Sequence, residues 1–589
     1  MCGIFGYVGD RTQLGTEVLR ALKSLEYRGY DSWGVALGVN GHIDVEKSVG
    51  KISRLDLQMP DSDIGFGHTR WATHGRVTEA NAHPHLSCDG RLAVIHNGIV
   101  ENFRDLKSVL IETGHSFRSD TDSEVIAHLL EDELSHHGGD LAAALAAVFP
   151  RLAGLNAIIA LDVRSRELVA TKNVSPLVAG LGPHGAVIAS DTTALHGYTD
   201  EVLYLEDAHL VRLNQHGFVL YDRDTMNVLD PELCPLELDS SGRELGDYPH
   251  FMAKEMAEQP AVIETFVRTK TDAVAALASA IEAARGTFLV GCGTASYAAL
   301  SGAYLFSRIA AHHVNFVVGS EFKYHDHFIT PRSLVVALSQ SGETADVIEA
   351  MMTARVKGAR LGAIVNVERS TLDRMVDLRV PLGAGPEQCV LSTKAYTAKV
   401  AALLLTAHAL AGNTDRGREE LLQAAQGLRG MLRPDWIGQV QAIATDIQSA
   451  DHLFIIGRGL AYPTALEAAL KIKEVSYVHA EGFAGGELKH GVIALIAPNT
   501  PCVVYAPNDE TRADILSGAM ELKSRGGYIV GIGTQYDPCF DAYLEVPDVG
   551  HAAPIVNALP AQMLGYQLAL LRGNDPDKPR NLAKSVTVK

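Results

Sequence analysis

The chain has 589 residues, with 51 Lys or Arg against 70 Asp or Glu, so its formal net charge at pH 7 is −19. This length exceeds a single hydrophobic core and predicts several domains, and the acidic balance argues against nucleic acid as the main partner. No apolar run approaches the ~20 residues of a membrane span, and the N-terminus lacks the features of a signal peptide. We therefore expect a cytoplasmic protein without a membrane partner.

The cysteines and histidines do not indicate a metal site. The seven cysteines are widely scattered and none has CxxC spacing, so neither a disulfide framework nor a zinc site is expected. The sequence His83-Pro84-His85 is isolated and is interpreted as a loop. We predict that no metal is bound.

Cys2 is the first candidate for chemistry. Removal of Met1 would leave it as the first residue with a free α-amine. A thiol has a pKa near ~8.5 and an α-amine one near ~7.7 to 8.0, so the amine can accept the thiol proton, directly or through a water. The alternative is that Cys2 is a small apolar residue at the start of a strand, because residues 4–8 are typical of one.

Residues 1–220 are predicted to form one domain. Short apolar runs alternate with Gly, Asp and Asn, as in antiparallel strands. Strands are expected at 4–8, 33–39, 64–67, 92–96, 157–162 and 186–190, and helices at 12–25 and 122–133. An α+β layered domain is therefore expected.

Three polar clusters in this domain, at 68–75, 96–98 and 119–122, lie at the ends of predicted strands or before a predicted helix. Each has a simpler explanation. Asn97 and Gly98 can form only a turn, Asp122 only a helix cap, and Arg70 only a surface charge.

Taken together with Cys2, the clusters resemble the class II glutamine amidotransferase domain, which has the N-terminal nucleophile hydrolase fold. The matching segments, in order, are MCGIFGYVG, LEYRGYDS, GHTRWATHG, HNGIVEN and SDTDSEVIAHL. The resemblance implies that Cys2 attacks glutamine, that Arg70 holds its carboxylate and that Asp122 pairs with its α-ammonium group. One departure is Trp33, which stands where a small residue is expected.

The same resemblance assigns the remainder of the glutamine site. It implies that the Asn97 side-chain amide and the Gly98 N–H form the oxyanion hole, and that Thr73 and His74 line the glutamine pocket. Trp71 matches the position of a bulky ring between two active sites. It is therefore the residue expected to line an ammonia channel.

Residues 221–247 are polar and without a clear period, which predicts an interdomain linker. The second half then contains an internal repeat. Residues 287–294 and 452–459 each combine a strand, a Gly-x-Gly turn and the start of an Ala-rich helix. Two α/β domains with parallel sheets are indicated, at 248–425 and 426–579, followed by a tail at 580–589.

The loops that follow the strands distinguish the two copies, because ligands of such folds bind where these loops meet helix N-termini. In copy one the loop is hydroxyl-rich and suits a phosphate ester through Ser339, Gln340, Ser341 and Thr344. In copy two, residues 507–511 carry acids that would repel phosphate. A helix cap is the alternative for the first loop, and the lone Gly291-x-Gly293 is weak support for a dinucleotide site.

Motifs through the second half extend the resemblance to nearly the whole chain. FMAKEMAEQP, GCGTASY, SQSGETAD, LSTKAYT, ALEAALKIKE, HAEGFAGGELKHG and PRNLAKSVTV look like the family of isomerizing glutamine–fructose-6-phosphate aminotransferases, with two sugar isomerase (SIS) domains. The resemblance implies conversion of D-fructose 6-phosphate and glutamine to D-glucosamine 6-phosphate and glutamate, the first step of hexosamine (UDP-N-acetylglucosamine) synthesis, without a cofactor. Two alternatives remain: an amidotransferase for another keto-sugar phosphate, and a sugar-phosphate sensor without catalysis.

A helix predicted over 466–477 places Glu467, Lys471 and Glu474 on one face. Such a set is ordinarily a surface ladder of ion pairs. The resemblance implies instead that Glu474 moves a proton between C1 and C2 of the sugar. Lys471 would then assist at the substrate hydroxyls, and Glu467 would be a secondary acid or base.

The resemblance also assigns two residues outside this helix. It implies that His490 opens the sugar ring and reaches in from a neighbouring subunit, so at least a homodimer is expected. It implies that Lys584 forms a Schiff base with the C2 carbonyl, although a disordered basic tail is the alternative. The sugar-phosphate set is completed by Gly293, Thr294, Val390 and Ala583, with Ala295 standing where a serine is expected.

Overall fold

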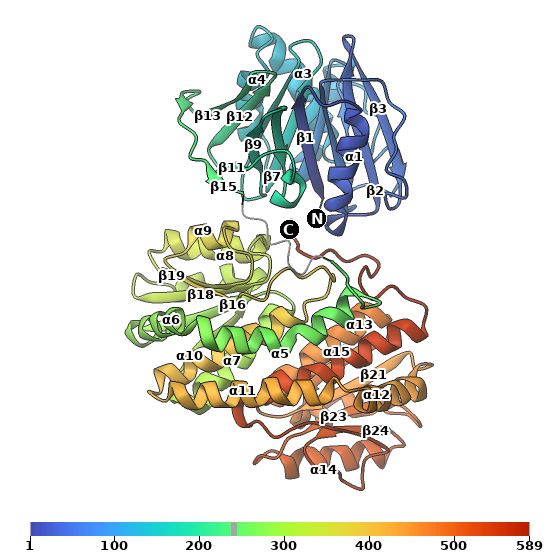
Figure 1. Ribbon diagram of the computed structural model, residues 1–589, viewed down its shortest axis with the longest axis vertical. Helices are drawn as coiled ribbons and strands as arrows, with labels where there is room; N and C mark the ends of the chain where they lie inside the picture. The colour runs from blue at the N-terminus through green and yellow to red at the C-terminus, as the bar shows by residue number, and fades with distance from the viewer. Residues whose placement is uncertain (1, 237–243, 588–589) are drawn as a thin grey trace. The chain divides into compact units, whose positions relative to one another are not determined.

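The computed structural model describes residues 2–236 and 244–587. The chain forms two compact units, one holding residues up to 236 together with 583–587 and the other holding 244–582. Figure 1 shows the course of the chain through these units. No helix within the described ranges has both the length and the apolar character needed to cross a membrane.

The first unit contains two antiparallel sheets. The eight-stranded sheet has the order β15 (Cys234–Pro235), β11 (Glu201–Tyr204), β9 (Val178–Gly182), β10 (Gly185–Ala189), β1 (Gly3–Gly9), β4 (Ile64–Arg70), β2 (Ser32–Val39), β3 (His42–Val49). The seven-stranded sheet has the order β14 (Val228–Leu229), β13 (Gly217–Asp222), β12 (His209–Asn214), β8 (Glu167–Lys172), β7 (Asn156–Asp162), β6 (Leu92–Gly98), β5 (His85–Leu86). Helices α1 (Leu14–Ser24), α2 (Phe103–Glu112), α3 (Glu124–His136) and α4 (Leu141–Val148), with 3-10 turns η1 (Glu26–Arg28), η2 (Phe149–Arg151) and η3 (Thr192–Leu195), complete the unit.

Side-chain alternation along β1 explains the layers of this unit. Ile4 and Val8 pack in a core shared by both sheets, whereas Phe5 and Tyr7 pack on the opposite face with residues of α1. A third cluster joins the other face of the seven-stranded sheet to α3 and α4. The unit is therefore a helix–sheet–sheet–helix arrangement, and the predicted α+β class with antiparallel strands is confirmed.

Two expectations change here. Trp33 is 4% exposed and lies in the cluster between the eight-stranded sheet and α1, so the bulky ring is part of the core. The segment predicted as a linker is partly sheet, because β14 pairs with β13 and β15 pairs with β11. Two-residue strands of this kind depend on an available sheet edge and leave no periodic pattern. Residues 237–243 of that segment lie outside the described residues.

The second unit contains two parallel five-stranded sheets. Their orders are β17 (Asn315–Val318), β16 (Gly286–Gly291), β18 (Ser333–Ser339), β19 (Arg360–Val365), β20 (Leu378–Pro381), and β22 (His479–Ala484), β21 (His452–Gly457), β23 (Pro501–Ala506), β24 (Tyr528–Gly533), β25 (Ala542–Glu545). The order is the same in both when counted along the chain. The predicted repeat with parallel sheets is thereby confirmed.

Helices join the two repeats of this unit into one body. They are α5 (Phe251–Thr269), α6 (Thr271–Ala283), α7 (Thr294–Ala310), α8 (Ala345–Val356), α9 (Thr371–Met375), α10 (Lys394–Leu410), α11 (Thr414–Met431), α12 (Pro434–Ile447), α13 (Ala461–Ser476), α14 (Arg512–Lys523) and α15 (Ala553–Leu571), with 3-10 turns η4 (Gly319–Phe328), η5 (Gly485–His490), η6 (Val492–Leu495) and η7 (Gly550–Ala552). One core cluster takes residues from α5, α7, α10, α13 and α15, and Figure 1 shows these helices between the two sheets. The repeats therefore share a hydrophobic core.

Candidate active sites

Cys2 lies at the end of a central strand. Gly3 of β1 pairs with Thr69 of β4, so Cys2 comes beside the residues that follow β4. The Trp71 N–H donates to Cys2 Sγ at 3.3 Å, and Asn97 Nδ2 donates to the Cys2 carbonyl oxygen at 3.0 Å. The ends of β1, β4 and β6 thus meet at this thiol. The structure brings together Cys2, Trp71 and Asn97, as the motifs predict.

Burial and the neighbouring groups shift the pKa of the Cys2 thiol in opposite directions. Burial raises the pKa of the thiol, while the Trp71 N–H and the positive charges of Arg70 and Arg28 lower it. Arg28 Nε also donates to the Cys2 carbonyl oxygen at 3.3 Å. Burial outweighs these groups and the net pKa of the Cys2 thiol is raised, so the Trp71 N–H and the two arginines offset only part of the cost of forming the thiolate that attack requires.

Arg70, at the end of β4, is buried and organises the loop that follows. Its guanidinium donates to the backbone oxygens of residues 74–76. Burial lowers the pKa of Arg70, whereas negative charge on Cys2, Asp122 and Asp31 raises it. Asp122 accepts a hydrogen bond from Val100 N at 2.7 Å. The cation and the anion expected to bind the two ends of glutamine's α-amino acid group therefore lie near the thiol.

Asn97 and Gly98 end β6, and the residues behind them fix their geometry. His68 Nε2 lies 3.1 Å from both Asn97 Oδ1 and the His96 carbonyl oxygen. Because both partners are acceptors, Nε2 carries the proton, and burial lowers the pKa of His68 to about 3, which keeps the ring neutral. The Asn97 oxygen is thus held by His68 and its NH₂ group faces Cys2. Gly98 has φ +148, and a Cβ there would lie 2.1 Å from the Leu155 carbonyl oxygen.

Thr73 and His74 lie in the loop after β4. Thr73 is exposed, and the His74 ring packs edge-on against Phe103 with 5.5 Å between ring centroids. Both are therefore available beside Arg70. Their role in glutamine binding and the channel role of Trp71 stay predictions.

The Glu467, Lys471 and Glu474 set lies on α13. Lys471 Nζ is 2.7 Å from Glu474 Oε2 and 3.6 Å from Glu467 Oε1. Lys471 and Glu467 are each 1% exposed and the Glu474 side chain is 19% exposed. The alternative of a solvated ion-pair ladder is therefore wrong.

Burial raises the pKa of Glu467 to about 7, with the Glu474 charge adding to the effect and Lys471 opposing it. Burial lowers the pKa of Lys471, but Glu467 and Glu474 outweigh it and the net pKa is raised. Thr294 Oγ1 at the start of α7 donates to Glu467 Oε1 at 3.3 Å. A carboxyl group that titrates near neutrality, beside a permanently charged lysine, suits acid–base chemistry.

The serine loop connects β18 to α8, as its pattern predicts. Ser339 Oγ accepts from Gly342 N at 2.9 Å and Ser341 Oγ accepts from Glu343 N at 3.1 Å. These bonds hold the loop in a tight turn at the α8 N-terminus, with Gly342 at φ +68. Gln340 and Thr344 are partly exposed on the same turn. Phosphate binding by this loop stays a prediction.

Val390, which the resemblance places in the sugar-phosphate set, lies in a segment that is anchored to residues 576–577. Val390 N donates to the Asp577 carbonyl oxygen at 3.0 Å, and Cys389 Sγ donates to the Pro576 carbonyl oxygen at 3.4 Å. Glu387 Oε1 accepts from Thr393 N and Ala395 N. The backbone of this segment is therefore tied at both ends.

His490 belongs to the same unit as the α13 set, whereas Lys584 does not. His490 is exposed at the end of η5. Ala583 and Lys584 group with the first unit, whereas Glu467 and Glu474 belong to the second. Ser585 and Thr587 are buried, so the described part of the tail, up to residue 587, is packed and the disordered-tail alternative is wrong for it.

Known domain families match the two units of the chain separately. A glutamine amidotransferase domain model matches residues 68–197, and an SIS domain model matches 280–409 and 446–572. Glutamine–fructose-6-phosphate aminotransferase (isomerizing) of Thermococcus kodakarensis is 40% identical, and that of Thermus thermophilus is 42% identical, each over 100% of both chains. The chain belongs to the isomerizing glutamine–fructose-6-phosphate aminotransferase family.

Solved structures place the second unit in the same family. The C-terminal domain of glucosamine-fructose-6-phosphate aminotransferase from Francisella tularensis is 32% identical, with a TM-score of 0.52, and covers 57% of this chain and 100% of that one. A putative phosphosugar isomerase from Silicibacter pomeroyi, at 24% identity and a TM-score of 0.50 over 56% of this chain and 100% of that one, shows the fold alone. The predicted family and fold class are confirmed.

Two features of this family member were not predicted from its motifs. Lys399 is buried on α10, and its charge lowers the pKa of Glu467, opposing the effect of burial. Its signal in the sequence was a lysine in the middle of an otherwise mostly apolar helix, beyond Lys394 at the helix start. His68, which orients Asn97, is the second residue of the GHTRWATHG motif.

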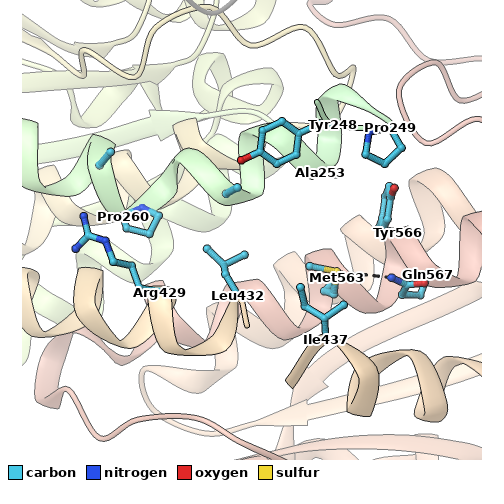
Figure 2. Close-up of a pocket in the computed structure, with 12 residues that line it drawn as sticks. Tyr248, Pro249, Ala253, Pro260, Arg429, Leu432, Ile437, Met563, Tyr566 and Gln567 are labelled. Carbon is cyan, nitrogen blue, oxygen red and sulfur yellow. Dashed lines mark hydrogen bonds between the residues drawn. The ribbon is translucent and has the colours of Figure 1, made fainter. Parts of the chain in front are cut away.

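A groove of about 540 Å³ lies elsewhere on the second unit. Figure 2 shows its lining from α5, α11, α12, α15 and the residues beside them, including Tyr248, Pro260, Leu432, Met563 and Tyr566. None of the predicted sugar-phosphate residues lines it. Its walls are mainly apolar, so it is not a candidate for a phosphorylated sugar.

Proposed function

We propose that this chain converts D-fructose 6-phosphate and glutamine to D-glucosamine 6-phosphate and glutamate. One observation carries the proposal: the same chain holds a thiol beside an oriented amide donor, and a buried Glu–Lys–Glu set in an isomerase fold. Identity of about 40% over the full length of aminotransferases supports it. A different keto-sugar phosphate remains the alternative substrate.

The glutamine half-reaction begins at Cys2. The thiolate attacks the side-chain amide carbon of glutamine, whose carboxylate is held by Arg70 and whose α-ammonium group pairs with Asp122. The oxyanion that forms accepts hydrogen bonds from Asn97 and Gly98. Collapse of this intermediate expels ammonia and leaves a thioester, which water then cleaves to glutamate and the free thiol.

The sugar half-reaction uses the second set. His490 assists ring opening, and the Lys584 amine condenses with the C2 carbonyl, releasing water. Ammonia then displaces the lysine and forms an imine at C2. Glu474 carries a proton from C1 to C2, and the proton of the C1 hydroxyl passes to the imine nitrogen as the C1 carbonyl forms, which gives the 2-amino aldose.

Lys471 holds Glu474 in place, and Glu467 serves as a secondary acid or base. The serine loop binds the phosphate through Ser339, Gln340, Ser341 and Thr344, with Gly293, Thr294, Val390 and Ala583 completing the pocket. Trp71 shields the ammonia passage from water. The exposure of His490 in one chain supports a role in a partner's site, so we propose at least a homodimer, located in the cytoplasm.

The test uses glutamine labelled with ¹⁵N at its amide, together with fructose 6-phosphate. We expect labelled glucosamine 6-phosphate and glutamate in equal amounts. Cys2→Ala should give neither product from glutamine, and other ketose phosphates at equal concentration should give less amino sugar. Formation of glutamate without any amino sugar would refute the coupling.

A further inference from the structure

Four side chains converge in the first unit at a place that the glutamine chemistry does not use. Cys88 lies in the turn between β5 and β6, His115 follows α2, and His128 and Glu131 lie one turn apart on α3. One ligand atom from each lies within 4.8 Å of all the others. None of the four is among the residues assigned to glutamine.

The distances between these atoms match the edges of a zinc tetrahedron. Cys88 Sγ is 3.6 Å from Nδ1 of both His115 and His128. Glu131 Oε2 is 3.3 Å from His115 Nδ1 and 3.4 Å from His128 Nδ1. Zinc bonds of about 2.3 Å to sulfur and about 2.0 to 2.1 Å to nitrogen or oxygen give tetrahedral edges of about 3.6 Å and about 3.4 Å.

An outer carboxylate holds the His115 imidazole in the orientation that ligation requires, and a second carboxylate lies near the outer nitrogen of His128 without a hydrogen bond to it. His115 Nε2 lies 2.9 Å from Asp132 Oδ1, and His128 Nε2 lies 3.7 Å from Glu124 Oε1. Each ring therefore turns Nδ1 toward the cluster and its other nitrogen toward a carboxylate. Carboxylates in this position are the usual second partners of metal-bound histidines.

Glu131 is also fixed before any ion binds. Its Oε2 accepts from Cys88 N at 2.9 Å and its Oε1 accepts from Asp89 N at 3.1 Å. The carboxylate thus joins α3 to the turn that carries the thiol.

We propose that Cys88, His115, His128 and Glu131 bind one zinc ion. A thiolate, two neutral imidazoles and a carboxylate carry two negative charges, which balance a divalent cation. The thiolate and imidazoles favour zinc over magnesium or calcium. On binding, the Cys88 thiol releases its proton to solvent and sulfur bonds to the metal. Four protein ligands leave no open position, so the site is structural.

The position of the site suggests what it stabilises. The turn with Cys88 leads into β6, which ends at Asn97 and Gly98, and α3 follows Asp122. An ion at the cluster therefore joins the two segments that carry the oxyanion donors and the carboxylate for the α-ammonium group.

A second group of possible ligands lacks these features. His408, Glu420 and His551 offer three ligand atoms, and Arg416 Nε lies 3.2 Å from Glu420 Oε1. The arginine already supplies the positive charge there. Within residues 2–236 and 244–587, the ion pairs of the Cys88 cluster join its histidines to carboxylates and include no arginine or lysine.

The test titrates cobalt(II) into the full-length, chelator-treated protein and follows its absorption. We expect one equivalent to bind with visible d–d bands of tetrahedral cobalt and a near-ultraviolet thiolate-to-cobalt band, both displaced by zinc. Cys88→Ser should lose the thiolate band, and Cys234→Ser, which alters a partly buried cysteine of the same unit, should keep it.

Elemental analysis of the untreated protein gives an independent readout. We expect one zinc per chain in the wild type and in Cys234→Ser. Absence of a thiolate band in the wild type, or its persistence in Cys88→Ser, would overturn the site. Both readouts on the wild-type protein stand even if Cys88→Ser fails to fold, and neither depends on aminotransferase activity.

Discussion

Lys471 and Glu474 form a 2.7 Å ion pair one turn apart on α13, with the lysine buried and the glutamate partly exposed. Burying such a pair costs desolvation free energy that a surface ladder avoids. The geometry leaves Glu474 as the member of the set that a substrate can reach. The lysine behind it holds the carboxylate in one orientation.

Glu474→Gln should abolish sugar isomerisation while leaving glutamine hydrolysis in place. Loss of a positioned acid or base lowers kcat by about 10² to 10⁴-fold. Amino-sugar formation with ammonia as the nitrogen source measures the second unit separately from the first. Lys473→Gln, which changes the exposed neighbour, is the control and should retain activity. Equal activity of both variants would contradict the assignment.

Glu467 should make stability depend on pH. Its pKa is about 7 in the folded protein against 4.5 for an ordinary glutamate, so the folded state retains a proton that the unfolded chain loses. The free energy of unfolding should therefore fall as pH rises from 4.5 to 7, by up to about 3 kcal/mol relative to Glu467→Gln. Urea unfolding across this range measures the difference. Glu481→Gln, at an exposed position, should show no such trend.

Asn97→Ala should lower kcat for glutamine hydrolysis by about 10² to 10³-fold, because one oxyanion donor is lost. The substitution also leaves the buried His68 Nε2–H with one acceptor fewer. Steady-state glutaminase assays measure the effect. Ammonia-dependent amino-sugar formation should be unchanged, and a parallel loss of that activity would indicate misfolding.

Gly98→Ala tests the backbone of the same site. A Cβ would lie 2.1 Å from the Leu155 carbonyl oxygen, so the chain must move and the N–H donor with it. We expect at least about 100-fold lower glutaminase activity. Gly41→Ala also has positive φ but open space around it, so it should cost stability without loss of activity.

Cys2→Ala should abolish glutamine use and leave sugar-phosphate isomerisation measurable. The thiol is the nucleophile of the first half-reaction, and no other cysteine is bonded to Trp71 among the described residues. Glutamate release and isomerisation of fructose 6-phosphate are measured on the same preparation. Residual glutamine hydrolysis at the wild-type rate would show that another group attacks the amide.

Much of the fold is predictable from local patterns, and the exceptions have physical reasons. The apolar runs of β1, β4 and β7 are strands because both of their faces are buried. Helix α4 is missed because LAAALAAV is apolar on every side and has no period, although Asp140 caps it through Ala142 N and Ala143 N. Strands β14 and β15 depend on partners distant in sequence.

Some of the candidate sites are also predictable from the sequence, and others are not. Motifs in the family resemblance lead to Cys2, Arg70 and Glu474 because each motif is contiguous. The Cys88 cluster escapes a search for CxxC spacing because its ligands come from three segments. The available signal was the spacing of His128 and Glu131, which places both on one face of α3.

The repeat in the second unit has a consequence for how its site arose. Thr294, after the first strand of one copy, bonds to Glu467 on the helix after the first strand of the other. Each copy supplies one partner of this hydrogen bond. If two identical copies were related by a two-fold axis, each would supply both partners, and the contact would occur twice. Joining the copies in one polypeptide lets each diverge, and the acid-rich loop at 507–511 now replaces the serine loop in one of them. The second unit therefore joins two copies of one strand order whose loops after the third strand differ, serine-rich in one copy and acid-rich in the other.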